Sequence, residues 1–171
     1  MDIGRIPARD GEGAVHVFVE IPKGGHNKYE IDEELGVIRF DRALHSAVYY
    51  PAEYGFVPGT AGEDGEHLDA LVLMDEPTFA GCLVSTRLLG TLTIEGSDGR
   101  QEHKLLAVPV REPRFDEYSD IADVPQHVLR EIEHFFDTFK ELEGSTITSR
   151  GWAGSEEAAH VLDAAVASGR A

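Results

Sequence analysis

The order of hydrophobic and polar residues predicts strands in the first two thirds of the chain and helices in the last third. Valine alternates with other residues from position 15 to 20, and shorter alternating or apolar runs follow. A period of two is typical of β-strands. Gly, Pro and acidic clusters separate the runs, which favours a small barrel over alternating βα units. We expect strands at residues 15–20, 28–31, 36–42, 68–74, 83–94 and 104–110.

The C-terminal third changes to a helical period. Apolar residues recur every three or four positions between residues 128 and 142. Asp123 is a candidate cap at the beginning of this helix, and Gly144 is a candidate end. Ser155 is a candidate cap for a second helix that ends near residue 168. Three phenylalanines of the first helix should pack against the sheet: Phe135, Phe136 and Phe139.

Length and charge limit the possible functions. The 171 residues fit one domain, spanning residues 1–171. The chain has 15 Lys and Arg against 32 Asp and Glu, a formal net charge of −17. The negative electrostatic field of such a chain disfavours broad attachment to nucleic acid or to an anionic membrane. An anionic substrate would have to be attracted by bound cations and by a few focused Lys or Arg side chains.

The cysteine content and the N-terminal residues favour a cytoplasmic protein. Cys82 is the single cysteine, which excludes an intrachain disulfide and suits a reducing compartment. Residues 1–13 carry charges and lack a continuous apolar stretch, so we expect neither a signal peptide nor a membrane anchor. The eight histidines show no zinc-ligand spacing.

Acidic residues are concentrated just before one of the predicted strands. Asp64 and Glu66 are two positions apart, and Asp69 lies at the start of the apolar run at 68–74. In an extended segment the first two would share a face, so three carboxylates could meet at the mouth of a strand and bind a hard cation. We name residues 62–67 the acidic turn. Taken alone, it is better explained as a solvated turn, since Glu-Asp-Gly-Glu is ordinary turn chemistry and acidic turns are common.

Several phrases along the chain, in a fixed order, resemble one protein family. They include Glu20-Ile21-Pro22-Lys23-Gly24, Asn27-Lys28-Tyr29-Glu30, Tyr50-Pro51-Ala52-Glu53-Tyr54-Gly55-Phe56, Ala107-Val108-Pro109 and Ile132-Glu133-His134-Phe135-Phe136. From about Val15 to Trp152 the chain resembles the family I soluble inorganic pyrophosphatases. The resemblance implies an α+β, mainly β fold, a five-stranded OB-like β-barrel flanked by two C-terminal helices. It also implies a homo-oligomer, most often a hexamer in bacteria.

The resemblance further implies hydrolysis of inorganic diphosphate to two orthophosphates by a water activated by Mg²⁺, with Mn²⁺ as an alternative ion. It gives Glu66 the position of the general base. Metal ligands would be Asp64, Asp69 and Glu102, while Glu20 and Glu30 would act mainly through metal-bound water. The substrate phosphates would be bound by Lys28, Arg42, Tyr54, Lys104 and Lys140. Of these, Lys28, Arg42 and Tyr54 join Glu66 as catalytic residues.

The chain departs from the family pattern at several of these positions. The family signature is Asp-Gly-Asp-Pro-aliphatic-Asp, but Glu66 is one methylene longer than the second aspartate and His67 replaces proline. Glu102 likewise replaces an aspartate, and Phe139 replaces a tyrosine. The loop at residues 95–101 differs in length, so that either Glu95 or Asp98 is the candidate for the remaining metal-binding aspartate; of the two, we place Asp98 among the metal ligands.

Three functions are compatible with this pattern. The first is an Mg²⁺-dependent inorganic diphosphatase. The second is a metal-dependent hydrolase or transferase of a larger diphosphate or phosphoester. The third is a catalytically inactive paralogue that serves as a binding or assembly protein. The joint presence of Lys28, Arg42, Asp64, Asp69 and Lys104 favours an enzyme, because a scaffold needs none of these side chains, and we expect the first function.

Overall fold

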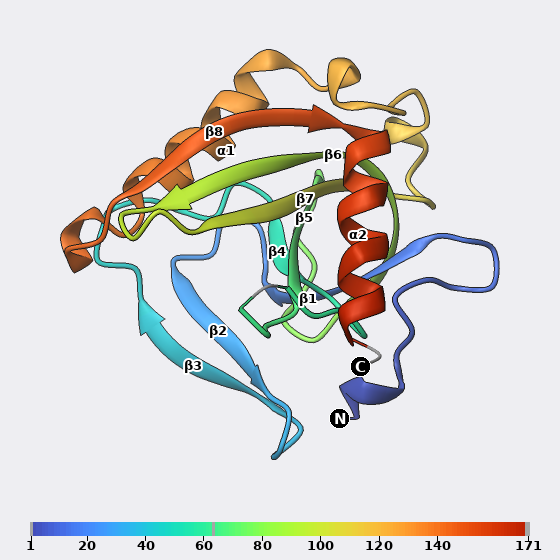
Figure 1. Cartoon of the computed structure of the whole chain (residues 1–171), viewed down its shortest axis with the longest axis horizontal. Coiled ribbons are helices and arrows are strands. Elements are labelled where there is room, and N and C mark those ends of the chain that lie inside the picture. Colours follow the sequence, from blue (N-terminus) through green and yellow to red (C-terminus); the bar gives the residue numbers. More distant parts are fainter. Residues whose placement is uncertain (1, 63, 170–171) are drawn as a thin grey trace.

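A ring of five strands forms the centre of the molecule (Figure 1). The computed structural model describes residues 2–62 and 64–169. The ring order is β1 (Val15–Ile21), β4 (Glu53–Val57), β5 (Leu68–Val72), β7 (Gln101–Pro109) and β6 (Leu83–Gly96). β6 then pairs with β1 and closes the barrel. β5 and β7 are parallel, whereas the other ring pairs are antiparallel.

Three further strands lie outside the ring. β8 (Ile147–Gly154) pairs with β6 and extends the sheet. β2 (Asn27–Asp32) and β3 (Val37–Ala43) form a separate two-stranded hairpin. This hairpin projects away from the barrel body in Figure 1. Its outward residues are largely exposed, because β2 and β3 pair with each other and not with the ring.

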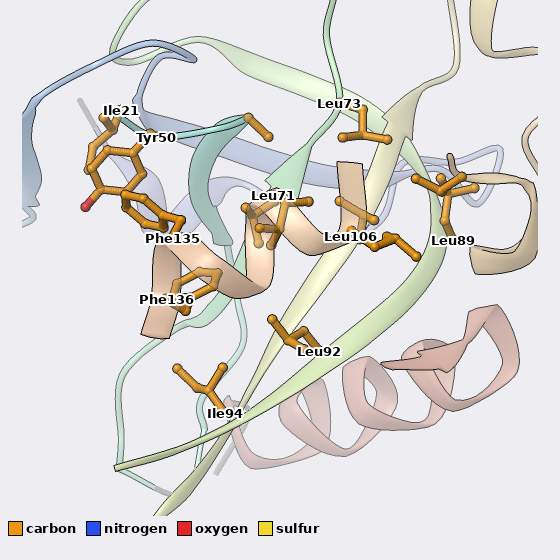
Figure 2. Packing of buried hydrophobic residues seen from close by; sticks show 14 of the residues in the cluster. Ile21, Tyr50, Leu71, Leu73, Leu89, Leu92, Ile94, Leu106, Phe135 and Phe136 are labelled. Atoms are coloured by element: carbon orange, nitrogen blue, oxygen red, sulfur yellow. The ribbon is translucent and has the colours of Figure 1, made fainter. Parts of the chain in front are cut away.

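Two helices pack on the barrel, each through one apolar stripe. α1 (Gln126–Thr138) buries Leu129, Ile132, Phe135 and Phe136. α2 (Ser155–Gly169) buries Ala158, Leu162 and Ala165. Figure 2 shows Phe135 and Phe136 with Tyr50 and Leu71 in the larger cluster of buried side chains. No helix in the described residues is long and apolar enough to span a membrane.

The observed fold confirms the OB-like barrel with two C-terminal helices and the packing of the three phenylalanines. Two strands were missing from the prediction, β4 and β8. β4 contains Gly55, whose backbone passes so close to Phe18 that a Cβ would lie 1.9 Å from the Phe18 carbonyl oxygen. A glycine inside a strand thus marks a close approach of two backbones, and the surrounding residues were read only as a motif.

The expected helix boundaries were partly wrong. Asp123 does not cap α1; its carboxylate accepts hydrogen bonds from the Ser119 and Asp120 backbone N–H groups at 2.8 and 2.9 Å. Val124 precedes a proline and is extended, so α1 begins only after Pro125. Gly144, with φ of 81°, ends a short 3-10 turn that follows α1. The second helix begins at Ser155, one residue before the expected start, and the Ser155 hydroxyl donates to Asp120 at 2.7 Å.

Candidate active site

A polar pocket of about 180 Å³ lies between the barrel, the hairpin and the C-terminal end of α1. Its apolar wall is formed by Tyr50, Ile94, Phe136, Phe139 and Ile147. Its charged and hydroxyl groups are Lys28, Tyr54, Asp69, Glu102, Lys104 and Lys140. All six polar side chains were predicted as site residues from the sequence. The fold therefore brings together groups that are up to 112 positions apart in the chain, from residue 28 to residue 140.

The centre of the pocket is a network around Lys104 on β7. Its ammonium donates to Asp69 Oδ2 and, at 2.8 Å, to Glu102 Oε2. The Tyr54 hydroxyl donates to the same Asp69 oxygen at 2.7 Å. Burial alone would lower the pKa of Lys104, but attraction by Asp69 and Glu102 outweighs it and the pKa is raised. Burial, followed by the charge of Asp69, raises the pKa of Tyr54 well above its ordinary value, so the hydroxyl stays a donor.

The hairpin of β2 and β3 supplies two further cations, Lys28 and Arg42. Lys28 on β2 faces Arg42 on β3 across the strand pair. Lys28 bonds to Glu30 and lies 3.3 Å from Asp41, while Arg42 lies 2.5 Å from Asp41. Burial opposes ionisation of Asp41, but Lys28 and Arg42 hold its pKa below the ordinary value. Asp41 thus keeps the two cations close together.

Lys140, just after α1, completes the cation group. No carboxylate in the described residues lies within 4 Å of its Nζ, which sits 5.4 Å from the centre of the Phe139 ring. Burial lowers the pKa of Lys140, and the charges of Lys28 and Arg42 lower it further. Cations that face one another in this way repel, and an anion bound between them would remove that repulsion. The arrangement is that of an anion site.

Glu20 borders the site from the end of β1. Its Oε1 accepts from the Ile31 N–H of the hairpin at 2.7 Å. Burial, with added repulsion from Asp69 and Glu30, raises the pKa of Glu20 to about 7. Glu20 and Glu30 therefore lie beside the pocket without lining it.

The acidic turn is exposed, and Glu63 within it lies outside the described residues. Asp64 Oδ1 accepts from the Glu66 N–H at 3.0 Å. This bond holds the Asp64 side chain on the turn, whereas the Glu66 side chain is exposed; both residues lie just before β5, which carries Asp69. Asp64 and Glu66 are close in sequence to the pocket residue Asp69, but neither side chain lines the pocket.

Glu95, near the end of β6, and Asp98, in the loop between β6 and β7, are the two candidates for the remaining metal-binding aspartate. Asp98 is at the tip, where it accepts from the Arg100 N–H at 3.0 Å. Glu95 lies 2.7 Å from Arg150 of β8 and accepts from Gln101 at 3.0 Å. Neither side chain belongs to the pocket lining.

Sequence reasoning missed two acids that hold the site cations, Asp41 and Glu143. The Glu143 carboxylate lies 2.7 Å from Arg42 Nε, although the two residues are far apart in the chain. Asp41 could have been found, because it adjoins Arg42 on a predicted strand. Glu143 carries no local signal, since its role depends on how the segment after α1 returns to the hairpin.

The donors present fit a hard cation. No three His, Cys, Asp or Glu side chains of the described part of the chain are grouped as a complete metal site. Mg²⁺, however, usually keeps several waters and binds through one or two carboxylates together with substrate phosphates. Asp69 and Glu102 provide two such carboxylates on facing sides of the Lys104 ammonium. The oxygen donors of the pocket are thus those that Mg²⁺ prefers.

Comparisons with known proteins agree with this geometry. The family model described as inorganic pyrophosphatase matches residues 17–169. The inorganic pyrophosphatase of Geobacillus stearothermophilus is 47% identical over 153 residues, covering 90% of this chain and 92% of that protein. The one from Streptomyces coelicolor is 48% identical over 143 residues, covering 83% and 87%. A crystal structure of inorganic pyrophosphatase from Thermus thermophilus superposes with a TM-score of 0.94 at 38% identity, covering 100% of both chains. The chain therefore belongs to the inorganic pyrophosphatase family.

Proposed function

We propose that the protein hydrolyses inorganic diphosphate to two orthophosphates. The observation that carries the proposal is the pocket in which Lys28, Lys104 and Lys140 meet Asp69 and Glu102. The family relatives described above are named for this activity. They give no support to the two alternatives, a hydrolase of larger phosphoesters and an inactive assembly protein.

The chain's own cations would bind and orient the two phosphoryl groups. Lys28, Lys104, Lys140 and the Tyr54 hydroxyl line the pocket, and Arg42 is paired with Lys28 across the hairpin without lining it. In a pocket of low dielectric these groups stabilise the charge that develops on the leaving phosphate. Phosphoryl transfer needs little covalent chemistry from the protein, so positioning and electrostatics supply most of the rate.

A bound divalent cation supplies charge neutralisation and a water of lowered pKa. We propose Mg²⁺, with Mn²⁺ as the alternative, held by Asp69, Glu102 and Asp64. Glu20 and Glu30 would accept hydrogen bonds from water around the ion. Asp98 is the weakest member of the proposed set, because its carboxylate closes the tip of the loop between β6 and β7.

Glu66 is the proposed general base. A base must come within about 2.6 to 3.2 Å of the proton that it removes. Its exposed side chain on the acidic turn is free to move toward the pocket, whereas the carboxylates of Asp69 and Glu102 are held by Lys104. We further propose that the protein assembles as a homo-oligomer, with a hexamer as the expected form, and acts in the cytoplasm.

The test is a phosphate-release assay on purified protein over a range of Mg²⁺ concentrations, with chelator as the blank. We expect metal-dependent release by the wild type and a fall of about 100-fold or more for Asp69→Asn and Glu66→Gln, the range seen when a positioned acid or base is removed. Asp116→Asn, an exposed site outside the pocket, is the matched control. Folded wild type without metal-dependent release would exclude the function, and an unimpaired Glu66→Gln would exclude Glu66 as the base.

A further inference from the structure

His67 closes the acidic turn at its base. Its ring stacks on Phe56 of β4, with centroids 4.5 Å apart and an interplanar angle of 6°. Its Nδ1 lies 2.8 Å from the Thr60 carbonyl oxygen, which can only accept, so Nδ1 is the donor. The Thr60 hydroxyl accepts from the Leu68 N–H at 2.9 Å. The two ends of the segment 60–68 are therefore joined twice, and the ring of His67 has one fixed orientation.

The other edge of the same ring reaches the hairpin. His67 Nε2 lies 2.9 Å from Glu33 Oε1, and Glu33 belongs to the turn between β2 and β3. The stacking partner Phe56 lies in the small apolar cluster against which Ile31 and Ile38 of the hairpin pack. His67 thus contacts both the barrel and the hairpin.

This contact joins two parts of the site that no strand pairing connects. The hairpin carries Lys28 and Arg42 and is a sheet of its own. The acidic turn carries Asp64 and Glu66 and precedes β5 of the ring. An error of roughly 1 Å between reacting groups can cost on the order of a hundredfold in rate. The distance between hairpin and turn is therefore a quantity that the enzyme has to fix.

We propose that His67 is a positioning residue, which, through Glu33, sets the distance between the hairpin cations and the acidic turn. The inference rests on the proposed function, since it assigns the two halves to phosphate binding and to water activation. The competing explanation is a surface contact that only adds stability. Half-exposed pairs of this kind contribute little to stability, so the two explanations differ in what they predict for kcat.

Glu33→Ala is the decisive variant, because it removes the tie to the hairpin and leaves the stack on Phe56 and the Thr60 contact in place. Glu34→Ala removes a neighbouring exposed carboxylate and is the matched control. Glu33→Gln keeps an acceptor oxygen at the same distance and should restore most of the lost rate. His67→Phe keeps the stack and removes both nitrogen contacts.

Steady-state kinetics and amide hydrogen exchange of residues 60–67 are measured at one pH for the four single variants and for the double variant that combines Glu33→Ala with His67→Phe. We expect Glu33→Ala to lower kcat about 2- to 10-fold, the effect of one lost hydrogen bond, with KM changed less than twofold and faster exchange in the turn. His67→Phe in the Glu33→Ala background should lower kcat by less than it does alone. Equal kcat or equal exchange for Glu33→Ala and Glu34→Ala would overturn the proposal. If the wild type were inactive but the exchange difference between Glu33→Ala and Glu34→Ala were observed, diphosphate hydrolysis would be rejected. The His67–Glu33 contact between the turn and the hairpin would still be established.

Discussion

Replacing Lys104 by methionine tests the electrostatic centre of the pocket. The side chain is 5% exposed, and methionine is apolar and similar in length. The change removes the ammonium that donates to Asp69 and Glu102 and leaves their two carboxylates facing each other. At neutral pH the raised pKa of Lys104 keeps it charged in the folded protein, so the variant removes a full positive charge.

The loss of stability follows from the exposure of the partners. A hydrogen bond to a charged group contributes about 1.5–3 kcal/mol, and breaking a buried pair costs about 3–5 kcal/mol. The Asp69 and Glu102 side chains are 28% and 51% exposed, so water screens the carboxylates that are left behind. Removing a buried ammonium also relieves its own desolvation. We therefore expect a net loss of about 2 kcal/mol in the free energy of unfolding, at the lower end of these ranges.

Urea unfolding of wild type and Lys104→Met in chelator, and again in Mg²⁺, measures this loss. The carboxylates of the variant are no longer neutralised by the ammonium, so they should bind a divalent cation more tightly than those of the wild type; binding at a hundredfold excess over Kd adds about 2.7 kcal/mol. Mg²⁺ should therefore narrow the gap between variant and wild type. Arg100→Met removes a cation from an exposed pair and should cost less than about 0.5 kcal/mol. A loss for Lys104→Met no larger than that of Arg100→Met, or a gap unchanged by Mg²⁺, would refute the reasoning.

Two further predictions concern single hydrogen-bonding groups. Tyr54→Phe removes the donor to Asp69 and should lower kcat/KM about 10- to 100-fold, from the 1.5–3 kcal/mol of a bond to a charged group; unchanged kcat/KM would remove Tyr54 from the catalytic set. Asp120→Ala removes the acceptor for the Ser155 N–H and hydroxyl at the start of α2 and should cost about 1 kcal/mol at pH 7. The bonds from Ser155 lower the pKa of Asp120, so this contribution is present above about pH 4 and disappears as the pH falls through the folded-state pKa. Denaturant midpoints that differ equally at pH 7 and pH 3 would contradict this sign.

The fold was predictable where the pattern of the sequence is local. The alternating and apolar runs predicted β1, β6 and β7, which are buried over most of their length. They also predicted the two hairpin strands, although these are largely exposed. β8 was not predictable in this way. It mixes Ser, Arg and Gly, and Gly151 has a φ of 116°, so its strand pairing depends on β6 lying beside it.

The site was predictable in its cations and less so in their partners. The family resemblance identified Lys28, Lys104 and Lys140, and the pocket contains all three. Which acid pairs with which cation depends on tertiary contacts, such as that of Glu143 with Arg42. No local sequence pattern predicts these contacts. The same holds for His67, which replaces the proline of the family signature and so lacks the φ that proline would fix. Its contacts with Phe56, Thr60 and Glu33 provide a different constraint on the same turn.

The closure of the barrel also decides how the chain can fold. β1 pairs with β6, with Val15 opposite Thr86 and Val17 opposite Val84, and β7 (Gln101–Pro109) lies between β6 and β5 in the ring, so the ring cannot close until β7 has been made. Pairings so distant in sequence pay a large entropy of loop closure before they contribute stability, and they make folding slow. During synthesis, the edge of β1 that later pairs with β6 therefore stays unpaired, and an unpaired apolar strand can associate with other chains. Early recruitment of a chaperone to the N-terminal strand would protect the nascent chain over this interval.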